Sequence, residues 1–121
     1  MSRSAFSLKI FAGYLLGLGV VLVLAPNLLL TTFGFPATSE VWIRVLGFVV
    51  VNLSVYYWYA AKSDSKPLFL ATVFTRVFIL VAFGALAVFG LAKPMLVLFG
   101  AIDAIGGLWT YLSLRRDETT A

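Results

Sequence analysis

The chain of 121 residues contains no cysteine and no histidine. Without thiols it forms no disulfide, and without imidazole it lacks the side chain that most often moves protons near neutral pH. The same absences remove the usual ligands of haem, zinc and iron–sulfur clusters, so we expect none of these groups to be ligated by this chain. Catalysis is therefore less expected than binding, and the identity of any other cofactor is left open.

Charge is also scarce, because 12% of the residues are charged and 62% are hydrophobic. Soluble domains carry about 25% charged residues, and a domain this small leaves too much surface exposed to hide so many apolar side chains. The formal net charge is +4, but the basic residues do not cluster on one soluble face, as binding to nucleic acid requires. We expect the lipid bilayer as the surroundings of the chain and no nucleic-acid partner.

Four apolar stretches stand out, at residues 6–25, 40–61, 67–91 and 94–114. Each is close to the ~20 residues that an α-helix needs to cross a bilayer, and backbone groups in lipid must find hydrogen-bond partners within the helix. We therefore predict an all-α, polytopic membrane protein, a four-transmembrane-helix bundle forming a single transmembrane domain over residues 1–121. The apolar, amphipathic connection at residues 26–39 is expected to lie at the outer interface.

Residues that favour helix starts precede or open three of these spans. They are Ser39 and Glu40, Ser65 and Pro67, and Pro94. A serine at the N-cap accepts a hydrogen bond from a free amide of the first turn, and proline is tolerated in that turn. We expect the first span to be retained as a helix, because it is long for a signal peptide and lacks a clear small-x-small cleavage site.

The basic residues between the spans are distributed unevenly. One set of segments contains Arg3, Lys9, Lys62, Lys66, Arg115 and Arg116. The opposite set contains only Lys93. Because positive residues mark the cytoplasmic side of a membrane protein, we predict cytoplasmic N- and C-termini in a bacterial-type inner membrane.

Two charged residues lie deep inside the predicted spans. At 1.5 Å per residue, Asp103 lies ~13 Å below the outer face and Arg76 ~13 Å above the inner face of a core ~30 Å thick. A single charge at this depth costs ~2.5–3.5 kcal/mol on insertion scales, so we predict that Arg76 pairs with Asp103. Arg44 lies ~6 Å deep in the second span, and we expect it to share Asp103 or to pair with Glu40.

Polar and small residues accompany this predicted pair. Asn52, Thr72 and Thr110 are supporting members of the predicted polar centre. Small residues let membrane helices approach closely, which predicts packing at Gly13, Gly17, Gly47, Gly84, Gly100 and Gly107. A buried ion pair can also act only as a packing and register device, so the centre is either structural or functional.

Three segments carry a resemblance to a known family. They are VWIRVLGFVVVNLSVYYWYAAKS, FTRVFILVAFGALAVFGLA and FGAIDAIGGLWTYLSL, which contain R-x-x-G, an internal arginine and D-x-x-G-x-x-W-T. Over about residues 26–115 the chain resembles small bacterial four-helix inner-membrane proteins of the DoxX-like kind, whose pattern also has an arginine near the start of the first helix. The predicted span 6–25 has no arginine. The resemblance implies an association with quinone-linked redox complexes.

The leading hypothesis is a helix bundle that binds a lipophilic small molecule or a membrane-protein partner through the Arg76 and Asp103 centre. A second hypothesis is a small-solute or proton-coupled transporter, which with four helices would need a homo-oligomer. A third is an accessory subunit of a quinone-linked redox complex. The sequence does not choose between them.

Overall fold

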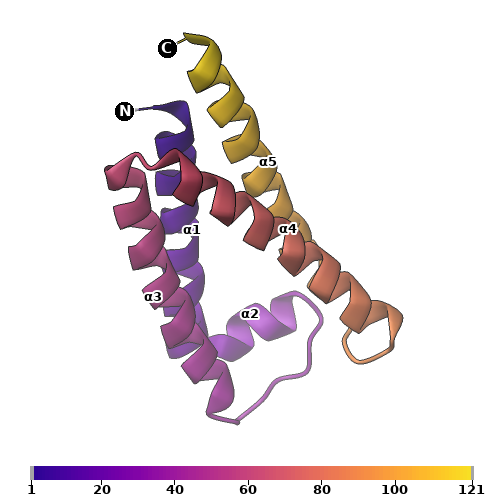
Figure 1. Ribbon diagram of the computed structural model, residues 1–121. Helices are drawn as coiled ribbons and strands as arrows, with labels where there is room; N and C mark the ends of the chain where they lie inside the picture. The colour runs from indigo at the N-terminus through magenta and orange to yellow at the C-terminus, as the bar shows by residue number, and fades with distance from the viewer. Residues whose placement is uncertain (1, 121) are drawn as a thin grey trace. The chain divides into compact units, whose positions relative to one another are not determined.

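The computed structural model describes the backbone of residues 2–120 and the side chains of residues 2–118. Its helices are α1 (Arg3–Leu24), α2 (Pro26–Thr32), α3 (Trp42–Ser63), α4 (Lys66–Val88) and α5 (Leu96–Thr120) (Figure 1). The described part of the chain contains no strand. Every helix except α2 is long and apolar enough to cross a membrane. The all-α fold class is confirmed, and the chain is an integral, multi-pass membrane protein.

The helix starts follow the predicted caps only in part. Ser65 caps α4, and its Oγ accepts a hydrogen bond from the Leu68 amide at 3.4 Å, as predicted. The prediction for Ser39 is wrong, because α3 begins later, at Trp42, and Glu40 instead accepts a hydrogen bond from the indole of that tryptophan. Pro94 also lies outside its helix, in the turn before α5.

The chain divides into two compact units. The terminal unit comprises Met1–Leu8 and Ala60–Ala121, and the central unit comprises Lys9–Tyr59. α1 and α3 each contribute residues to both units. The single transmembrane domain over residues 1–121 stays a prediction, and each unit is described by itself.

In the central unit, α1 and α3 are antiparallel and approach closely at two glycines. A Cβ atom built on Gly47 would lie 2.9 Å from the Gly19 carbonyl oxygen, and one built on Gly19 would lie 2.9 Å from the Gly47 oxygen. No side chain fits between backbones at this distance. Phe11 packs on Tyr57 nearer the start of α1, with 5.1 Å between ring centroids. The contact therefore depends on glycine at one level and on aromatic rings at another.

The connection between α1 and α3 contains the short helix α2 within the predicted amphipathic segment. Asn27 and Thr38 close the loop that follows, because the Asn27 amide donates to the Thr38 carbonyl at 3.1 Å and its oxygen accepts from the Thr38 amide at 2.8 Å. This pair stabilises the long loop by satisfying backbone groups at its end.

In the terminal unit, α4 and α5 lie side by side and antiparallel (Figure 1). A Cβ atom on Gly100 would lie 2.9 Å from the Leu80 Cα, and one on Gly107 would lie 3.4 Å from the Arg76 Cβ. These two contacts fix the register of the helix pair. Arg76 therefore faces Gly107, one helical turn away from Asp103.

Only some of the glycines predicted to pack against another helix do so. Gly47, Gly100 and Gly107 lie against a neighbouring helix, whereas Cβ atoms built on Gly13, Gly17 and Gly84 would meet nothing within 4 Å. Gly13, Gly17 and Gly84 thus make no close helix contact within their own units, and the packing role predicted for them stays a prediction. Small size permits a close approach but does not require one, and the G-x-x-x-G spacing on α1 says nothing about which face meets a neighbour.

Candidate functional site

Arg76 is the largest fully buried side chain among the described residues, with 2% of its surface exposed. Its Nε donates to the Thr72 carbonyl oxygen at 3.1 Å. Its Nη2 donates to the Thr72 Oγ1 and to the Thr110 Oγ1, each at 2.9 Å. Side chains on a helix point back toward its N-terminus, which is the direction that brings the guanidinium to Thr72. The neutral oxygens of Thr72, one turn earlier on α4, and of Thr110 on α5 thus stabilise this buried cation.

The hydrogen bonds continue from Thr110 to the first helix. The Ser7 hydroxyl lies 2.7 Å from the Thr110 hydroxyl and donates to the Ser4 carbonyl at 2.7 Å. Since Ser7 donates to a carbonyl, Thr110 is the donor to Ser7, and it accepts from Arg76. Thr72 behaves alike, donating to the Phe69 carbonyl at 2.7 Å. We call Arg76, Thr72, Thr110, Ser7 and Ser4 the hydroxyl column.

Asp103 does not form the predicted pair. No ion pair within 4.0 Å joins it to Arg76 among the residues described, although the arginine acts on it electrostatically. The prediction compared the depths of the two backbones and ignored the direction of the arginine side chain. The Arg76 side chain extends along α4 toward Thr72. Asp103 lies one turn from Gly107 in the opposite direction, so the two charged groups are separated. Asp103 is left half-buried in the middle of α5.

Arg44 and Asn52 belong to the central unit. The Arg44 guanidinium donates to the Val23 carbonyl, at the C-terminal end of α1, where a cation suits both the free carbonyls and the helix dipole. The alternative pairing of Arg44 with Glu40 is wrong, since Glu40 lies before α3 and accepts from Trp42. Asn52 is exposed. A shared centre of these residues with Arg76 stays a prediction.

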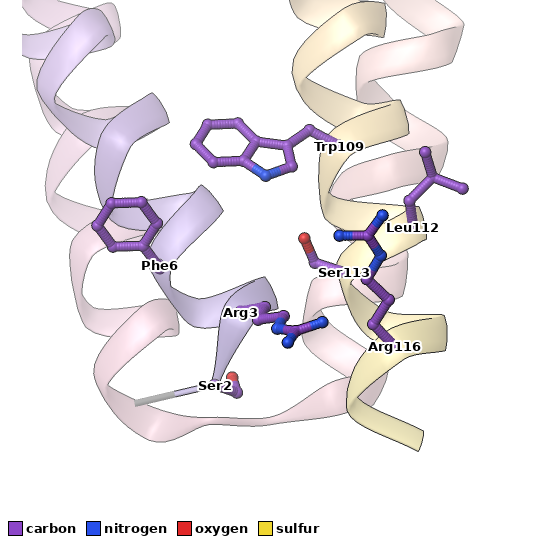
Figure 2. Close-up of a pocket in the computed structure, with 7 residues that line it drawn as sticks. All are labelled: Ser2, Arg3, Phe6, Trp109, Leu112, Ser113 and Arg116. Atoms are coloured by element: carbon purple, nitrogen blue, oxygen red, sulfur yellow. The ribbon is translucent and has the colours of Figure 1, made fainter. Parts of the chain in front are cut away.

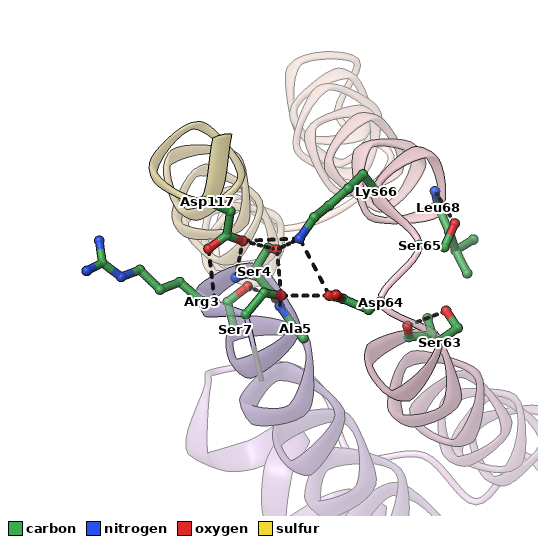
Figure 3. Close-up of polar contacts among 12 residues, drawn as sticks. Arg3, Ser4, Ala5, Ser7, Ser63, Asp64, Ser65, Lys66, Leu68 and Asp117 are labelled. Carbon is green, nitrogen blue, oxygen red and sulfur yellow. Dashed lines mark hydrogen bonds and ion pairs between the residues drawn. The ribbon is translucent and has the colours of Figure 1, made fainter. Parts of the chain in front are cut away.

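A second polar cluster joins three segments of the terminal unit (Figure 3). The Asp117 carboxylate, near the end of α5, accepts from the Ser4 hydroxyl at 2.6 Å and lies 3.3 Å from the Lys66 ammonium at the start of α4. Lys66 also reaches Asp64 at 3.5 Å, and the Ser2 hydroxyl donates to that carboxylate at 2.8 Å. We call these five residues the terminal cluster.

The terminal cluster also satisfies the first amides of α1. Asp117 accepts from the backbone N–H groups of Arg3 at 3.1 Å and Ser4 at 3.2 Å, and the Ser2 Oγ accepts from Ala5 at 3.1 Å. A carboxylate from one helix thus caps another, where the positive end of the helix dipole favours it. The sequence pattern did not predict this role, although Ser4 and Ser7 at helical spacing were a usable signal.

A cavity of about 660 Å³ opens beside the terminal cluster, between the start of α1 and the end of α5 (Figure 2). Its lining residues are Ser2, Arg3, Phe6, Trp109, Leu112, Ser113 and Arg116. The rings of Phe6 and Trp109 meet edge to face with 6.1 Å between centroids. Figure 2 shows the Arg3 side chain extending from α1 into the space between the two helices, and the Arg116 guanidinium directed toward the Ser113 hydroxyl. One end of the cavity is therefore aromatic and the other is cationic.

The chemistry available in this unit is recognition. Among the side chains described, no three His, Cys, Asp or Glu residues gather where they could bind a metal ion. The cavity offers cationic donors, hydroxyl groups and apolar surface, which match an amphiphilic molecule.

Comparison with known proteins gives no relative. No family model matches the chain, and neither a curated protein nor a solved structure matches it significantly. The DoxX-like resemblance and its link to quinone-linked redox complexes stay predictions, so function must be argued from the site itself.

Proposed function

We propose that this integral membrane protein binds a lipophilic small molecule in the cavity between the start of α1 and the end of α5. One observation carries the proposal: a single cavity of about 660 Å³ joins the Phe6 and Trp109 rings to the Arg3 and Arg116 side chains. Ligand sites commonly measure about 300–1,000 Å³, with mostly apolar walls and a few polar groups that orient the ligand.

The cavity is a better candidate than the predicted Arg76 and Asp103 centre. Arg76 is buried and bonded to Thr72 and Thr110, so a ligand head would have to displace these hydroxyls. Asp103, at mid-helix, is not paired with it. Thr110 and Ser7 instead support the site, because Thr110 lies next to Trp109 on α5 and is bonded to Ser7 on α1.

Mild extraction from native membranes followed by native mass spectrometry tests the proposal. We expect one amphiphilic molecule for each chain, retained at collision energies that strip detergent. The Phe6→Ala and Leu112→Ala variants enlarge the apolar end and are expected to lower the bound fraction. Leu70→Ala is the matched control, because Leu70 lines a different cavity on the other side of α5. A wild-type chain that carries only detergent contradicts the proposal.

We further propose that both termini lie in the cytoplasm of a bacterial-type cell. The support is the distribution of lysine and arginine, with Arg3, Lys66 and Arg116 at one end of the terminal unit. Green fluorescent protein fused to the C-terminus should fluoresce, and alkaline phosphatase fused there should be inactive. The reverse pattern contradicts the orientation.

Coupled transport by a homo-oligomer is a second candidate, favoured by Asp103. This half-buried carboxylate has no hydrogen bond or ion pair among the described residues, and acidic groups at such depth often serve ion pathways. Four helices are too few to enclose a pathway alone, so this function requires an oligomer. A strictly monomeric protein in mild detergent contradicts it.

A further inference from the structure

We infer that the molecule bound in this cavity is an anionic phospholipid, with its phosphate between Arg3 and Arg116 and its acyl chains against Phe6 and Trp109. This inference rests on the proposed function and names the ligand class. Guanidinium groups bind phosphate oxygens through paired N–H donors, and two of them line this cavity while no acidic residue does.

Ser113 supplies an independent observation. Its side chain is buried, with 5% exposed, and lines the cavity. No hydrogen bond joins its hydroxyl to the rest of the described chain. In Figure 2 this oxygen lies beside the Arg116 guanidinium. A hydroxyl group without a partner at the cationic end of the cavity is positioned to donate to a phosphate oxygen.

Arg3 is available to the ligand for a related reason. Its backbone amide is bonded to Asp117, but its side chain leaves the terminal cluster on the side away from Lys66 (Figure 3). No hydrogen bond or ion pair holds the Arg3 guanidinium to another described side chain. The cationic end of the cavity thus comes from side chains, because the first amides of α1 already have partners in Asp117 and Ser2.

The spacing along the helices fits a lipid across the membrane interface. Arg116 lies seven positions after Trp109 on α5, which is about 10 Å, and Arg3 lies one turn before Phe6 on α1. Tryptophan and arginine favour the boundary between acyl chains and head groups. The cavity therefore presents its cations at head-group depth and its rings where the acyl chains begin.

Quenching of Trp109 by brominated lipids tests the inference on the full chain in vesicles. Trp42→Phe and Trp58→Phe leave Trp109 as the only tryptophan. Brominated phosphatidylglycerol is titrated against brominated phosphatidylcholine of the same chain length. We expect about a tenfold preference for phosphatidylglycerol at Trp109, since each basic residue near an anionic head contributes about one kcal/mol at most.

Adjacent arginines give a matched control. Arg116→Gln and Arg3→Gln should each reduce the preference to about threefold, and the double variant should reduce it to near unity. Arg116→Lys should restore part of the loss. Arg115→Gln removes the same charge at the same level, but Arg115 lines the other cavity with Lys66 and Glu118. Its preference should stay near tenfold. Equal losses for Arg115→Gln and Arg116→Gln indicate a general surface charge effect and overturn the inference.

Two further results separate failure of the inference from failure of the proposed function. Equal, saturable quenching by both lipids overturns the phosphate assignment but leaves amphiphile binding intact. Displacement by a short-chain quinone in preference to phosphatidylglycerol does the same. Quenching that rises in proportion to bulk brominated lipid, with no saturation for any lipid, contradicts both the inference and the proposed function.

Discussion

The two units of this chain differ in the polar contacts that accompany their close helix packing. In the central unit, α1 and α3 meet at Gly19 and Gly47, where backbones approach too closely for any side chain. In the terminal unit, Arg76 is buried between helices and bonded to threonine hydroxyls. Lipid chains are as apolar as leucine, so helices in a bilayer need either close packing or polar contacts to associate. Both units have close packing at glycine, at Gly19 and Gly47 in the central unit and at Gly100 in the terminal unit. The terminal unit adds the buried polar contacts of Arg76.

The comparison predicts the largest single loss of stability at Gly47. A methyl group there would lie 2.9 Å from the Gly19 carbonyl oxygen, so Gly47→Ala must move a backbone. We expect a loss of about 2–3 kcal/mol in the free energy of unfolding. Gly17→Ala is the control, because its methyl would meet nothing within 4 Å, and it should be neutral or slightly stabilising. Denaturation in mixed micelles measures the free energy of unfolding of both variants. Equal losses would show that the contact between Gly19 and Gly47 does not stabilise the central unit.

The next effect is expected at Thr110, in the hydroxyl column. Thr110→Val keeps the shape but removes the acceptor for Arg76 and the bond to Ser7, so a buried charge loses a partner. We expect a loss of about 2 kcal/mol. Thr75→Val is the matched control, because Thr75 is exposed and bonds only to the carbonyl of Thr72 on its own helix. The midpoint temperature of thermal unfolding should be clearly lower for Thr110→Val than for Thr75→Val. Similar midpoints would show that the hydroxyl column does not stabilise the fold.

A smaller effect is expected at Asp117, which caps α1 from α5. Asp117→Ala removes the acceptor of two backbone amides and of Ser4, with an expected loss of about 1 kcal/mol. Hydrogen exchange at the first turn of α1 should rise at the same time. Glu118→Ala, on an exposed neighbour, should change neither quantity. Unchanged exchange in the Asp117 variant would show that the cap contributes nothing.

The smallest effect is expected at Asp103. A direct buried ion pair with Arg76 would make Asp103→Asn cost about 3–5 kcal/mol. Because no such pair forms, we expect less than about 0.5 kcal/mol, measured by the same micelle denaturation. A loss of several kcal/mol would restore the ion pair and make the terminal unit depend on charge pairing.

The helices could be predicted from the sequence because apolar length and capping residues act locally along the chain. Apolar length predicted the four spans, and Ser65 predicted the start of α4, since a cap acts within one turn. The start of α3 was predicted too early, because Ser39 is a suitable cap that the chain does not use. Propensity alone cannot choose between neighbouring capping residues.

The site could be predicted only in part. The estimate of depth identified Arg76 as a charge inside the spans, and the helix faces added Thr72 and Thr110. Neither could give the α4 and α5 register, which Gly100 and Gly107 set through contact. Arg116 was read only as a signal of orientation. Its place in a cavity depends on α1 and α5 lying close together in the terminal unit, which no spacing along the chain records.

Native mass spectrometry of two variants tests the central claim most directly. Arg76→Met replaces a buried charge with an apolar side chain, whereas Arg116→Gln removes a charge that lines the cavity. If Arg76 is a packing residue and the cavity is the binding site, the Arg76 variant retains its bound amphiphile and the Arg116 variant loses it. The opposite result, an Arg76 variant that folds without a bound amphiphile and an Arg116 variant that retains one, would contradict this claim.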